Sequence, residues 1–496
     1  MIFVTDSHTS KAIDNRLINE KNIPGIILME QAAMGVVNQI MQKESKRILV
    51  VCGSGNNGGD GFAVARILKM RNCNVKIAFI GKADKIKGDA LINYNAATGS
   101  NLSITVINDI YSFIYLLNWS DTVIDGIFGT GLDRNITGLH AEIINKINQS
   151  NAYKIAIDIP SGVNADNGKI LGICVKADET VTFQTIKRGL LLFPGRDVCG
   201  KLTVSPIASY DWQGNEFILE KKNIDNMLPK RFLNSHKGTY GKLLMIAGSD
   251  KYPGAAIISA KAAIKSGVGM IKLITCKRTA DCILSANPEI MTVVNDTWNS
   301  IDFNMLKQNI DWCDGISIGM GLGEGDAVCG IIEMVLDSGK KTLLDADALN
   351  TISKYEYLKN KLHSNCIITP HIGEFSKLTG IPISQIEESP LKITEDFLNK
   401  YDVNVLLKGA TSIIMSTNNK ICYNITGNSG LAKGGSGDML SGIISSYFVQ
   451  GMTVFDSACA GSFCTGYICQ NCNISENELT ASLIIDNYSV ICKNIN

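Results

Sequence analysis

The chain has 496 residues, of which 45% are hydrophobic and 19% are charged. This length exceeds what one compact hydrophobic core accommodates, so two or three domains are expected. The 47 Lys and Arg residues are balanced by 47 Asp and Glu residues, which leaves no overall basic field for nucleic acid or anionic lipid. We therefore expect neither nucleic-acid binding nor membrane association.

The amino-terminal sequence MIFVTDSHTSKAIDNR turns polar after four residues, unlike a signal peptide. No stretch approaches the roughly 18 uninterrupted apolar residues of a transmembrane helix. The 15 cysteines are scattered through apolar segments, which is typical of buried thiols in a reducing compartment. These features predict a cytoplasmic protein.

One group of cysteines has the spacing of some iron–sulfur sites, C-x4-C-x2-C, at Cys464, Cys469 and Cys472. The segment 457–469 has the composition of a core helix, however, and the next cysteine is Cys492 at the end of the chain. We therefore favour packing over cluster ligation.

Two helices are predicted near the amino terminus, because apolar residues between 10 and 44 recur with a helical period that Pro24-Gly25 interrupts. The next segment, RILVVCGSGNNGGDGFAVARIL, begins with a buried strand and ends in a helix that we expect to start at Phe62. Between them, residues 53–61 are expected to form a turn that places a ligand at the carboxyl end of a parallel strand. The amides and carboxylate of this turn suit ribose hydroxyls, an amide or a hard cation, and a tight turn with incidental amides is the alternative.

Further strand–loop–helix units predict that this half is a doubly wound α/β domain. The strands are expected at 75–80, 122–127 and 155–159, and strands between 173 and 205 complete the sheet. Asp125 and Asp158 lie at or near strand carboxyl ends. Each aspartate alone is often only a cap, but two of them beside glycine-rich loops favour a shared pocket.

Three motifs, GSGNNGGDG, DGIFGTGL and DIPSG, together resemble the N-terminal YjeF domain family, whose members epimerise hydrated NADH and NADPH. The resemblance covers roughly residues 1–212 and implies a Rossmann-like fold. It implies that potassium is bound by Asn57, Asp125 and Ser161, whose oxygens suit a hard cation. Asp158 is implied to contact the substrate and to act as its acid and base. The other implied contacts with the hydrated dinucleotide are Asn56, Asn57, Gly58, Gly59, Asp60, Gly129, Thr130, Gly131, Leu132, Asp133, Arg134 and Asn135.

A linker is expected at residues 213–224, in a mixed and charged stretch without a long period. Beyond it, strands predicted at 242–248, 270–275, 315–318, 342–346, 366–369 and 405–407 alternate with helices, and a β-pair follows at 412–415. This alternation predicts a second doubly wound α/β domain over residues 225–496.

The stretch Thr426–Gly442, TGNSGLAKGGSGDMLSG, is the most informative part of the second half. Small residues and glycines precede Asp438, and an apolar helical pattern follows it. A glycine-rich loop that opens a helix presents free N–H groups and the positive end of the helix dipole to an anion. Asp438 would repel a phosphate, but it suits a base that takes the proton of an attacking hydroxyl. A plain glycine-rich turn before a core helix is the alternative.

Two more polar residues follow predicted strands of this half. His371 beside Pro370 is either structural or a substrate contact. Lys408 is either a solvated surface charge or a group that neutralises a phosphate.

The motifs GSDKYPGAA, GMGLG, LDADALN, TPHIGEF, LLKGATS and GNSGLAKGGSGDMLSG resemble the C-terminal YjeF domain family, a ribokinase-like fold. Its members are ADP- or ATP-dependent dehydratases of hydrated NAD(P)H, and the domain order resembles that of the fused bacterial repair enzymes. The resemblance implies that Ala255, Gly321, His371 and Asp438 contact the hydrated nucleotide. The residues implied to hold the adenine nucleotide are Lys408, Gly409, Ala410, Thr411, Ser412, Asn428, Ser429, Gly430, Leu431, Ala432, Lys433, Gly434, Gly435, Ser436 and Gly437.

The combined expectation is repair of hydrated NADH and NADPH. The first domain would interconvert the R and S hydrates, and the second would dehydrate the S hydrate with release of AMP and phosphate. Asp438 is expected to take the hydroxyl proton while the amides of Gly435–Gly437 stabilise the transferring phosphoryl group. We expect K+ in the first domain, Mg2+ with ADP in the second, and a homo-oligomer. ATP as the donor stays open, and the alternative function is a vitamin or sugar kinase fused to a non-catalytic nucleotide-binding scaffold.

Overall fold

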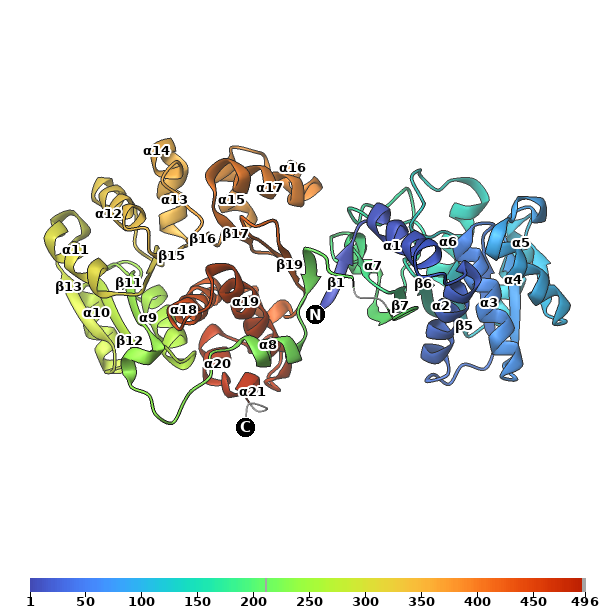
Figure 1. Cartoon of the computed structure of the whole chain (residues 1–496), viewed down its shortest axis with the longest axis horizontal. Coiled ribbons are helices and arrows are strands. Elements are labelled where there is room, and N and C mark those ends of the chain that lie inside the picture. Colours follow the sequence, from blue (N-terminus) through green and yellow to red (C-terminus); the bar gives the residue numbers. More distant parts are fainter. Residues whose placement is uncertain (210–211, 493–496) are drawn as a thin grey trace. The chain divides into compact units, whose positions relative to one another are not determined.

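The computed structural model describes residues 1–209 and 212–492, and the chain forms two compact units (Figure 1). One unit comprises Ile2–Gly214, and the other comprises Met1 with Asn215–Asn496. Residues 213–224, expected as a linker, include strand β10 (Glu216–Ile218) and the beginning of helix α8 (Lys221–Met227). No helix of the described residues is both long enough and apolar enough to cross a membrane.

The first unit is built on a parallel sheet with strand order β4-β3-β2-β5-β6-β7-β9. The chain moves outward from β2 to β4 on one side and from β5 to β7 on the other, so the direction reverses between β2 and β5. In doubly wound sheets, ligands bind at the carboxyl ends of the strands beside this switch point. The strands are β2 (Ile48–Cys52), β3 (Val75–Phe79), β4 (Ser103–Val106), β5 (Thr122–Gly126), β6 (Tyr153–Ile157), β7 (Glu179–Phe183) and β9 (Lys201–Ser205). In addition, β1 (Ile2–Thr5) pairs in parallel with β8 (Ile186–Lys187).

Helices cover both faces of this sheet because alternate side chains of its strands point to opposite faces. On β2, Ile48, Val50 and Cys52 pack against one group of helices that includes α2 and α3. Leu49 and Val51 pack against the group formed by α5 and α6. The helices are α1 (Ser7–Asn19), α2 (Gly25–Ile40), α3 (Asn56–Met70), η1 (Ala83–Lys85), α4 (Gly88–Gly99), α5 (Ile110–Trp119), α6 (Gly138–Gln149), η2 (Arg188–Leu190) and α7 (Gly195–Val198). The break predicted at Pro24-Gly25 is confirmed.

Helix α3 begins at Asn56, so the expectation that residues 53–61 form a turn and the helix starts at Phe62 was wrong. The first N–H groups of a helix need no partner inside the helix, so asparagine and glycine are tolerated in its first turn. Close packing also requires glycine here, because a Cβ on Gly58 would lie 1.9 Å from the carbonyl oxygen of Gly53.

The second unit contains a larger sheet with strand order β13-β12-β11-β14-β15-β16-β17-β18-β19-β10. Neighbouring strands are parallel from β13 to β17, whereas β18 is antiparallel to both β17 and β19. The strand order reverses between β11 and β14, which predicts a ligand site at their carboxyl ends. The strands are β11 (Lys242–Ile246), β12 (Met270–Cys276), β13 (Met291–Asn295), β14 (Gly315–Ile318), β15 (Lys341–Leu344), β16 (Cys366–Ile368), β17 (Asn404–Leu407), β18 (Ser412–Met415) and β19 (Ile421–Asn424).

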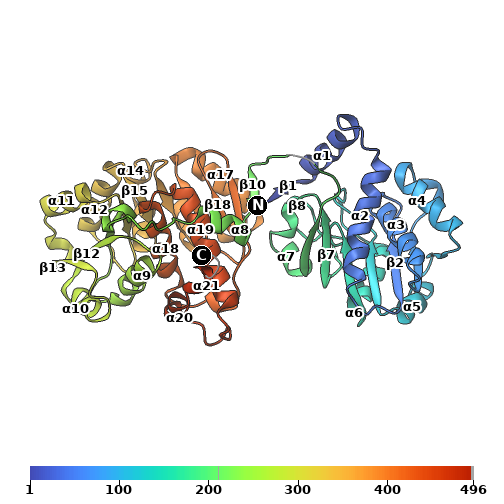
Figure 2. The same ribbon diagram turned by 60° about the horizontal axis from the view of Figure 1, so that its bottom comes forward.

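Helices lie on both sides of this sheet as well, and Figures 1 and 2 show α9, α18, α19 and α20 on one side and α11 to α17 on the other. Helix α18 packs against α9, α19, β14 and β15, which makes it the central helix of its layer. The helices are η3 (Lys237–Tyr240), α9 (Pro253–Lys265), α10 (Lys277–Ala286), η4 (Trp298–Ser300), α11 (Phe303–Trp312), α12 (Asp326–Asp337), α13 (Asp347–Lys354), α14 (Glu356–Lys359), α15 (Ile372–Thr379), α16 (Ile383–Glu388), α17 (Pro390–Tyr401), η5 (Ser429–Leu431), α18 (Ser436–Val449), α19 (Val454–Asn471), α20 (Ala481–Asp486) and α21 (Ser489–Cys492). Both units are therefore doubly wound three-layer α/β domains, as predicted. Cys464 and Cys469 are buried in α19, where they contribute to its packing.

Candidate active sites

Two side chains of the first unit, those of Asn57 and Ser161, contact the backbone of Phe128, which follows β5, and Asp125 contacts Ser161. The amide nitrogen of Asn57 donates to the Phe128 carbonyl oxygen over 2.9 Å. The hydroxyl of Ser161 accepts from the Phe128 N–H over 2.9 Å and donates to Oδ1 of Asp125 over 2.5 Å. The Ser161 N–H donates to the other carboxylate oxygen over 2.8 Å. The structure thus brings together the three residues implied as potassium ligands.

Asp125 is completely buried in β5, and burial raises the pKa of its carboxyl to about 6. The hydrogen bonds from the Ser161 side chain and backbone act in the opposite direction, because they favour the ionised form. A carboxylate, an amide oxygen, a hydroxyl and a backbone carbonyl at one buried point form an oxygen-only donor set. Such a set suits a hard monovalent or divalent cation.

Asp158 stands directly after β6 with a φ of +64°, a left-handed conformation that is uncommon outside glycine. Its Oδ1 accepts hydrogen bonds from the Thr182 hydroxyl over 3.0 Å and from the Phe183 N–H over 3.3 Å. The same oxygen forms a salt bridge with the buried ammonium of Lys187. Lys187 was not identified from the sequence, because one lysine in a short strand carries no motif.

Two further carboxyl groups act electrostatically on this centre. Burial raises the pKa of Asp60, in the first turns of α3, well above its ordinary value, and the charges of Asp158 and Asp14 raise it further. Burial likewise raises the pKa of Asp14, on α1, to about 6, although the nearby ammonium of Lys187 opposes this effect. Asp60 was predicted from the sequence, whereas Asp14 was not.

The remaining predicted contacts of this unit lie at the same edge of the sheet. Residues 56–60 form the start of α3 after β2, and residues 129–135 form the loop between β5 and α6. Most of this loop is exposed or half-buried. These segments, Asp158 and Ser161 therefore surround the switch point between β2 and β5.

In the second unit, Asp438 lies in the first turn of α18, because the helix begins at Ser436 rather than after the carboxylate as expected. Gly435 caps the helix with a φ of +90°, which a side chain would adopt only with strain. The pKa of Asp438 is raised to about 6 by burial first and then by the charge of Asp345, while Lys408 opposes the shift. A base of this kind is ionised near neutral pH and retains appreciable basicity.

Lys408 follows β17 and is paired with buried carboxylates, and its charge acts on Asp438. Its ammonium donates to Oδ1 of Asp345 over 2.9 Å and lies 3.8 Å from a carboxylate oxygen of Glu374. Burial lowers the pKa of Lys408, but the carboxylates of Asp345 and Glu374 outweigh this effect and the pKa is raised overall. The other oxygen of Asp345 accepts a hydrogen bond from the Ser441 hydroxyl over 2.7 Å. The solvated-surface interpretation of Lys408 is therefore excluded.

Asp345, Glu374 and Ser441 are the site residues that sequence reasoning missed in this unit. Asp345 and Glu374 lie in the strand-end motifs LDADALN and TPHIGEF, and this location at strand ends could have indicated that they belong to the site. Ser441 is one turn beyond Asp438, and only the helical period could have indicated it.

The two ring nitrogens of His371 have different surroundings, and the structural interpretation applies to Nδ1. Nδ1 caps α15, because it accepts from the N–H groups of Gly373 over 3.0 Å and of Glu374 over 3.3 Å. Nε2 lies on the other side of the ring, 3.6 Å from a Glu374 oxygen, and the side chain is 60% exposed. The backbone of His371 also forms a parallel bridge with Lys408, so the two predicted residues are neighbours.

Gly321 and Ala255, both predicted to contact the hydrated nucleotide, lie against each other. Gly321 follows β14 with a φ of +66°, and a Cβ there would lie 3.0 Å from the Cβ of Ala255. It would lie only 2.7 Å from the carbonyl oxygen of Tyr252, which precedes α9. These residues form a close turn at the switch point between β11 and β14.

The predicted nucleotide-binding residues lie in two segments: 408–412 connects β17 to the first residue of β18, and 428–437 follows β19 through η5 into the first residues of α18. Some side chains of the second segment are used internally. The ammonium of Lys433 donates to the carbonyl oxygens of Asn477 over 2.5 Å and Leu479 over 2.6 Å, so it does not extend toward a ligand. By contrast, the hydroxyl oxygen of Ser436 is buried without a hydrogen-bond partner among the described residues. The Ser436 N–H donates to the Lys433 carbonyl oxygen over 3.4 Å, so the N–H groups of Gly434, Gly435 and Gly437 are the backbone donors of this segment that an anion could use.

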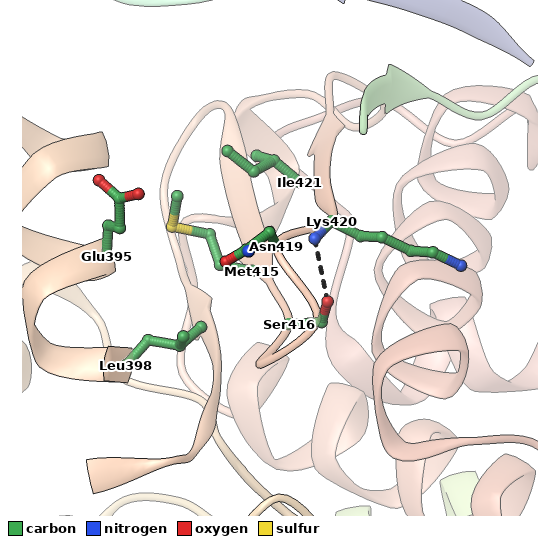
Figure 3. A pocket seen from close by; sticks show the side chains of 7 residues that line it. All are labelled: Glu395, Leu398, Met415, Ser416, Asn419, Lys420 and Ile421. Atoms are coloured by element: carbon green, nitrogen blue, oxygen red, sulfur yellow. Dashed lines mark hydrogen bonds between the residues drawn. The ribbon is translucent and has the colours of Figure 1, made fainter. Parts of the chain in front are cut away.

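A separate pocket lies at the opposite end of the second sheet (Figure 3). The β18–β19 turn forms one wall, where the Lys420 N–H donates to the Ser416 hydroxyl over 3.1 Å, and α17 contributes Glu395 and Leu398. Because β17 ends at the site and β18 runs back from it, this turn lies away from Asp438. The pocket is not part of the site.

Two families match the chain in the order expected. The YjeF-related protein N-terminus matches residues 25–189, and NAD(P)H-hydrate dehydratase matches residues 243–488. A ribokinase-like superfamily protein from Enterococcus faecalis V583 is similar in structure, with 24% identity and a TM-score of 0.51, over 58% of this chain and 99% of that protein. The first unit thus has a Rossmann-like fold and the second a ribokinase-like fold.

Two relatives span almost the whole chain. The bifunctional NAD(P)H-hydrate repair enzyme of Moorella thermoacetica is 33% identical over 473 residues, which cover 92% of this chain and 89% of the relative. That of Escherichia coli is 31% identical over 427 residues, with coverages of 85% and 80%. The chain therefore belongs to the family of bifunctional NAD(P)H-hydrate repair enzymes.

Proposed function

We propose that the chain returns hydrated NADH and NADPH to their usable forms in two reactions. The first unit interconverts the R and S hydrates, and the second dehydrates the S hydrate with ADP as phosphoryl donor. The observation that carries this proposal is the carboxylate of Asp438 in the first turn of α18, beside the backbone amides of an open glycine-rich loop.

The dehydration begins with transfer of a phosphoryl group to the ring hydroxyl of the hydrate. Asp438 takes the hydroxyl proton, the oxygen attacks the β-phosphorus of ADP, and AMP leaves. The amides of Gly435 and Gly437 and the Lys408 ammonium stabilise the charge on the transferring group. The ring nitrogen then expels phosphate, loss of a ring proton restores the 5,6 double bond, and NAD(P)H is released. Hydroxide is a poor leaving group, so the reaction depends on this activation.

Magnesium fits the second site because negative charge exceeds positive charge there before any nucleotide binds. The carboxylates of Asp345, Glu374 and Asp438 surround one ammonium, that of Lys408. A polyphosphate would be repelled unless a cation accompanied it. Because the oxygens of Asp345 already accept from Lys408, Ser441 and the Ala346 N–H, Mg2+ would be held mainly by the nucleotide phosphates, and it would neutralise them and supply electrostatic stabilisation of the transfer.

In the first unit, Asp158 is the acid and base of epimerisation. Its carboxylate takes the proton of the ring hydroxyl, the bond between that carbon and the ring nitrogen breaks, and an open-chain aldehyde forms. The ring nitrogen then attacks the opposite face of the aldehyde, and Asp158 returns the proton to the new hydroxyl. The loops 56–60 and 129–135 hold the dinucleotide during this exchange, and Asn57, Asp125 and Ser161 would hold K+.

Activity of purified protein on hydrated NADH tests the proposal. With S hydrate and ADP, the reduced-nicotinamide absorbance is expected to return, and Asp438→Asn should reduce turnover by roughly 10²–10⁴-fold while retaining ADP binding. Parallel reactions with ATP identify the donor. A stable phosphorylated product without recovered absorbance would instead indicate a kinase, and near-normal turnover of the variant would refute the role of Asp438.

A further inference from the structure

Lys187 is one of two buried lysines in the described part of the chain, and its side chain is only 2% exposed. It lies in β8, immediately after a turn in which Gln184 adopts a φ of +60°. An ammonium in such a position is unfavourable unless every hydrogen is matched by an acceptor. The contacts of Lys187 therefore indicate what the charge is used for.

All three ammonium hydrogens of Lys187 have acceptors within the protein. Nζ donates to Oδ1 of Asp158, to the Thr182 hydroxyl over 3.1 Å and to the Phe183 carbonyl oxygen over 3.1 Å. A lysine ammonium has no further donor to offer. Lys187 therefore cannot donate to a bound substrate while this arrangement holds, and any effect on the reaction passes through Asp158.

All hydrogen-bond donors to Asp158 among the described residues donate to the same carboxylate oxygen. Oδ1 receives the Thr182 hydroxyl over 3.0 Å, the Phe183 N–H over 3.3 Å and the Lys187 ammonium. No described residue forms a hydrogen bond with Oδ2. The carboxylate is therefore fixed through one oxygen, and the other is left for proton exchange.

The Lys187 ammonium also opposes the negative charges that surround Asp158. Asp14 on α1 and Asp60 on α3 both act on Asp158, and Lys187 is the cation that opposes them. Among the described residues, Asp158 is the one of these three carboxyl groups that forms a salt bridge with the Lys187 ammonium. Burial first and then the charge of Asp158 raise the pKa values of both Asp14 and Asp60, which favours their neutral forms.

We propose that Lys187 is the positioning residue of the epimerase site: it fixes Oδ1 of Asp158 through a salt bridge and leaves Oδ2 to face the hydrated ring. This inference rests on the epimerase function proposed above for the first unit. Lys187 acts only through Asp158 and does not touch the substrate.

The test uses the full chain with R hydrate and ADP, and an excess of the Asp158→Asn variant supplies dehydration of the S product. Lys187→Met removes the charge and keeps the length of the side chain. We expect kcat for epimerisation to fall at least tenfold with little change in KM, since positioned acid–base groups contribute roughly 10²–10⁴-fold. The acidic limb of the pH–rate profile should move to higher pH by about one unit or more, because the carboxylate loses its cation.

Lys154 provides a matched control in the same unit. It is also buried, but its ammonium donates to the carbonyl oxygens of Ser150 over 3.1 Å and Ala152 over 2.9 Å. Lys154→Met should lower the melting temperature and leave the pH profile in place. Circular dichroism and thermal melting of each variant report whether the first unit has folded, and dehydration of S hydrate reports only on the second unit.

A folded Lys187→Met variant with the wild-type pH limb would overturn the proposal, whether or not kcat falls. If Lys187→Met does not fold, Lys187→Arg is tested instead, because it keeps the positive charge. We expect its acidic limb at the wild-type pH and a lower kcat. Thr182→Val removes one hydrogen-bond donor from Oδ1 of Asp158, so its acidic limb should move to higher pH by less than that of Lys187→Met. A shifted limb in Lys187→Arg, or an unmoved limb in Thr182→Val, also overturns the proposal. Absence of epimerisation in the wild-type chain would instead refute the function on which the inference rests.

Discussion

The ionisation of Asp438 can be shifted by a change at Asp345, which makes the dehydratase site testable through pH. Burial and the charge of Asp345 raise the pKa of Asp438 to about 6, so the base loses its proton near that pH. The wild-type acidic limb of kcat/KM for dehydration should therefore lie near pH 6 and activity should fall below it. Asp345→Asn removes the larger of the two charges that raise this pKa, so the limb should move to lower pH.

The expected shift of the acidic limb follows from the groups that set the pKa of Asp438. An ordinary aspartate has a pKa of 3.8, and burial alone keeps Asp438 above that value after Asp345 is neutralised. Neighbouring charges typically account for about one unit or more, so we expect the limb to fall by about one pH unit. The plateau should drop roughly tenfold, about 1.4 kcal/mol of transition-state stabilisation, because Lys408 loses its 2.9 Å partner.

Initial rates with S hydrate and ADP, measured by reduced-nicotinamide absorbance across pH, provide the assay. Ser441→Ala is the matched control, because it removes the 2.7 Å hydrogen bond to Asp345 but keeps the carboxylate charge. That variant should lower the rate modestly and leave the limb near pH 6. An unmoved limb in Asp345→Asn, or an equal shift in both variants, would refute the electrostatic account.

Three further predictions concern other parts of the two sites. Affinity for K+, measured by calorimetry, should decline as pH falls through about 6, because protonation of Asp125 removes the charged ligand; a flat profile would exclude Asp125. Lys433→Met should change ADP affinity no more than about threefold and leave its salt dependence intact, since this ammonium binds backbone carbonyls; a strong salt effect would reveal a phosphate contact. Gly321→Ala should destabilise the fold by about 1–3 kcal/mol and raise KM for the hydrate, because its φ of +66° and the Tyr252 carbonyl exclude a Cβ; wild-type melting would contradict this.

The arrangement of strands was predictable because a buried parallel strand, a glycine-rich turn and an amphipathic helix each leave a distinct pattern. Helix starts were predicted less well. Residues such as Asn56 and Ser436 disfavour helix interiors, yet both begin helices here, where the first N–H groups need no internal partner. Propensity therefore misplaced those boundaries by several residues, although both segments were recognised from the sequence as candidate ligand loops.

The groups that tune the sites were not predictable, because their partners are distant in sequence. Lys187 meets Asp158 across 29 positions, and Ser441 meets Asp345 across 96. A single lysine or serine carries no local signal of such a contact, since the fold alone decides which side chains become neighbours. The motif residues could be found from their pattern, whereas the electrostatic network around them required the structure.

The central claim is that the ring hydroxyl leaves as phosphate after Asp438 has promoted its phosphorylation. The most direct test is the fate of oxygen-18 placed in that hydroxyl, with the Asp158→Asn chain used so that epimerisation does not exchange the label. A single turnover with ADP should release inorganic phosphate that carries the label. Recovery of the label in water, with unlabelled phosphate, would contradict the account.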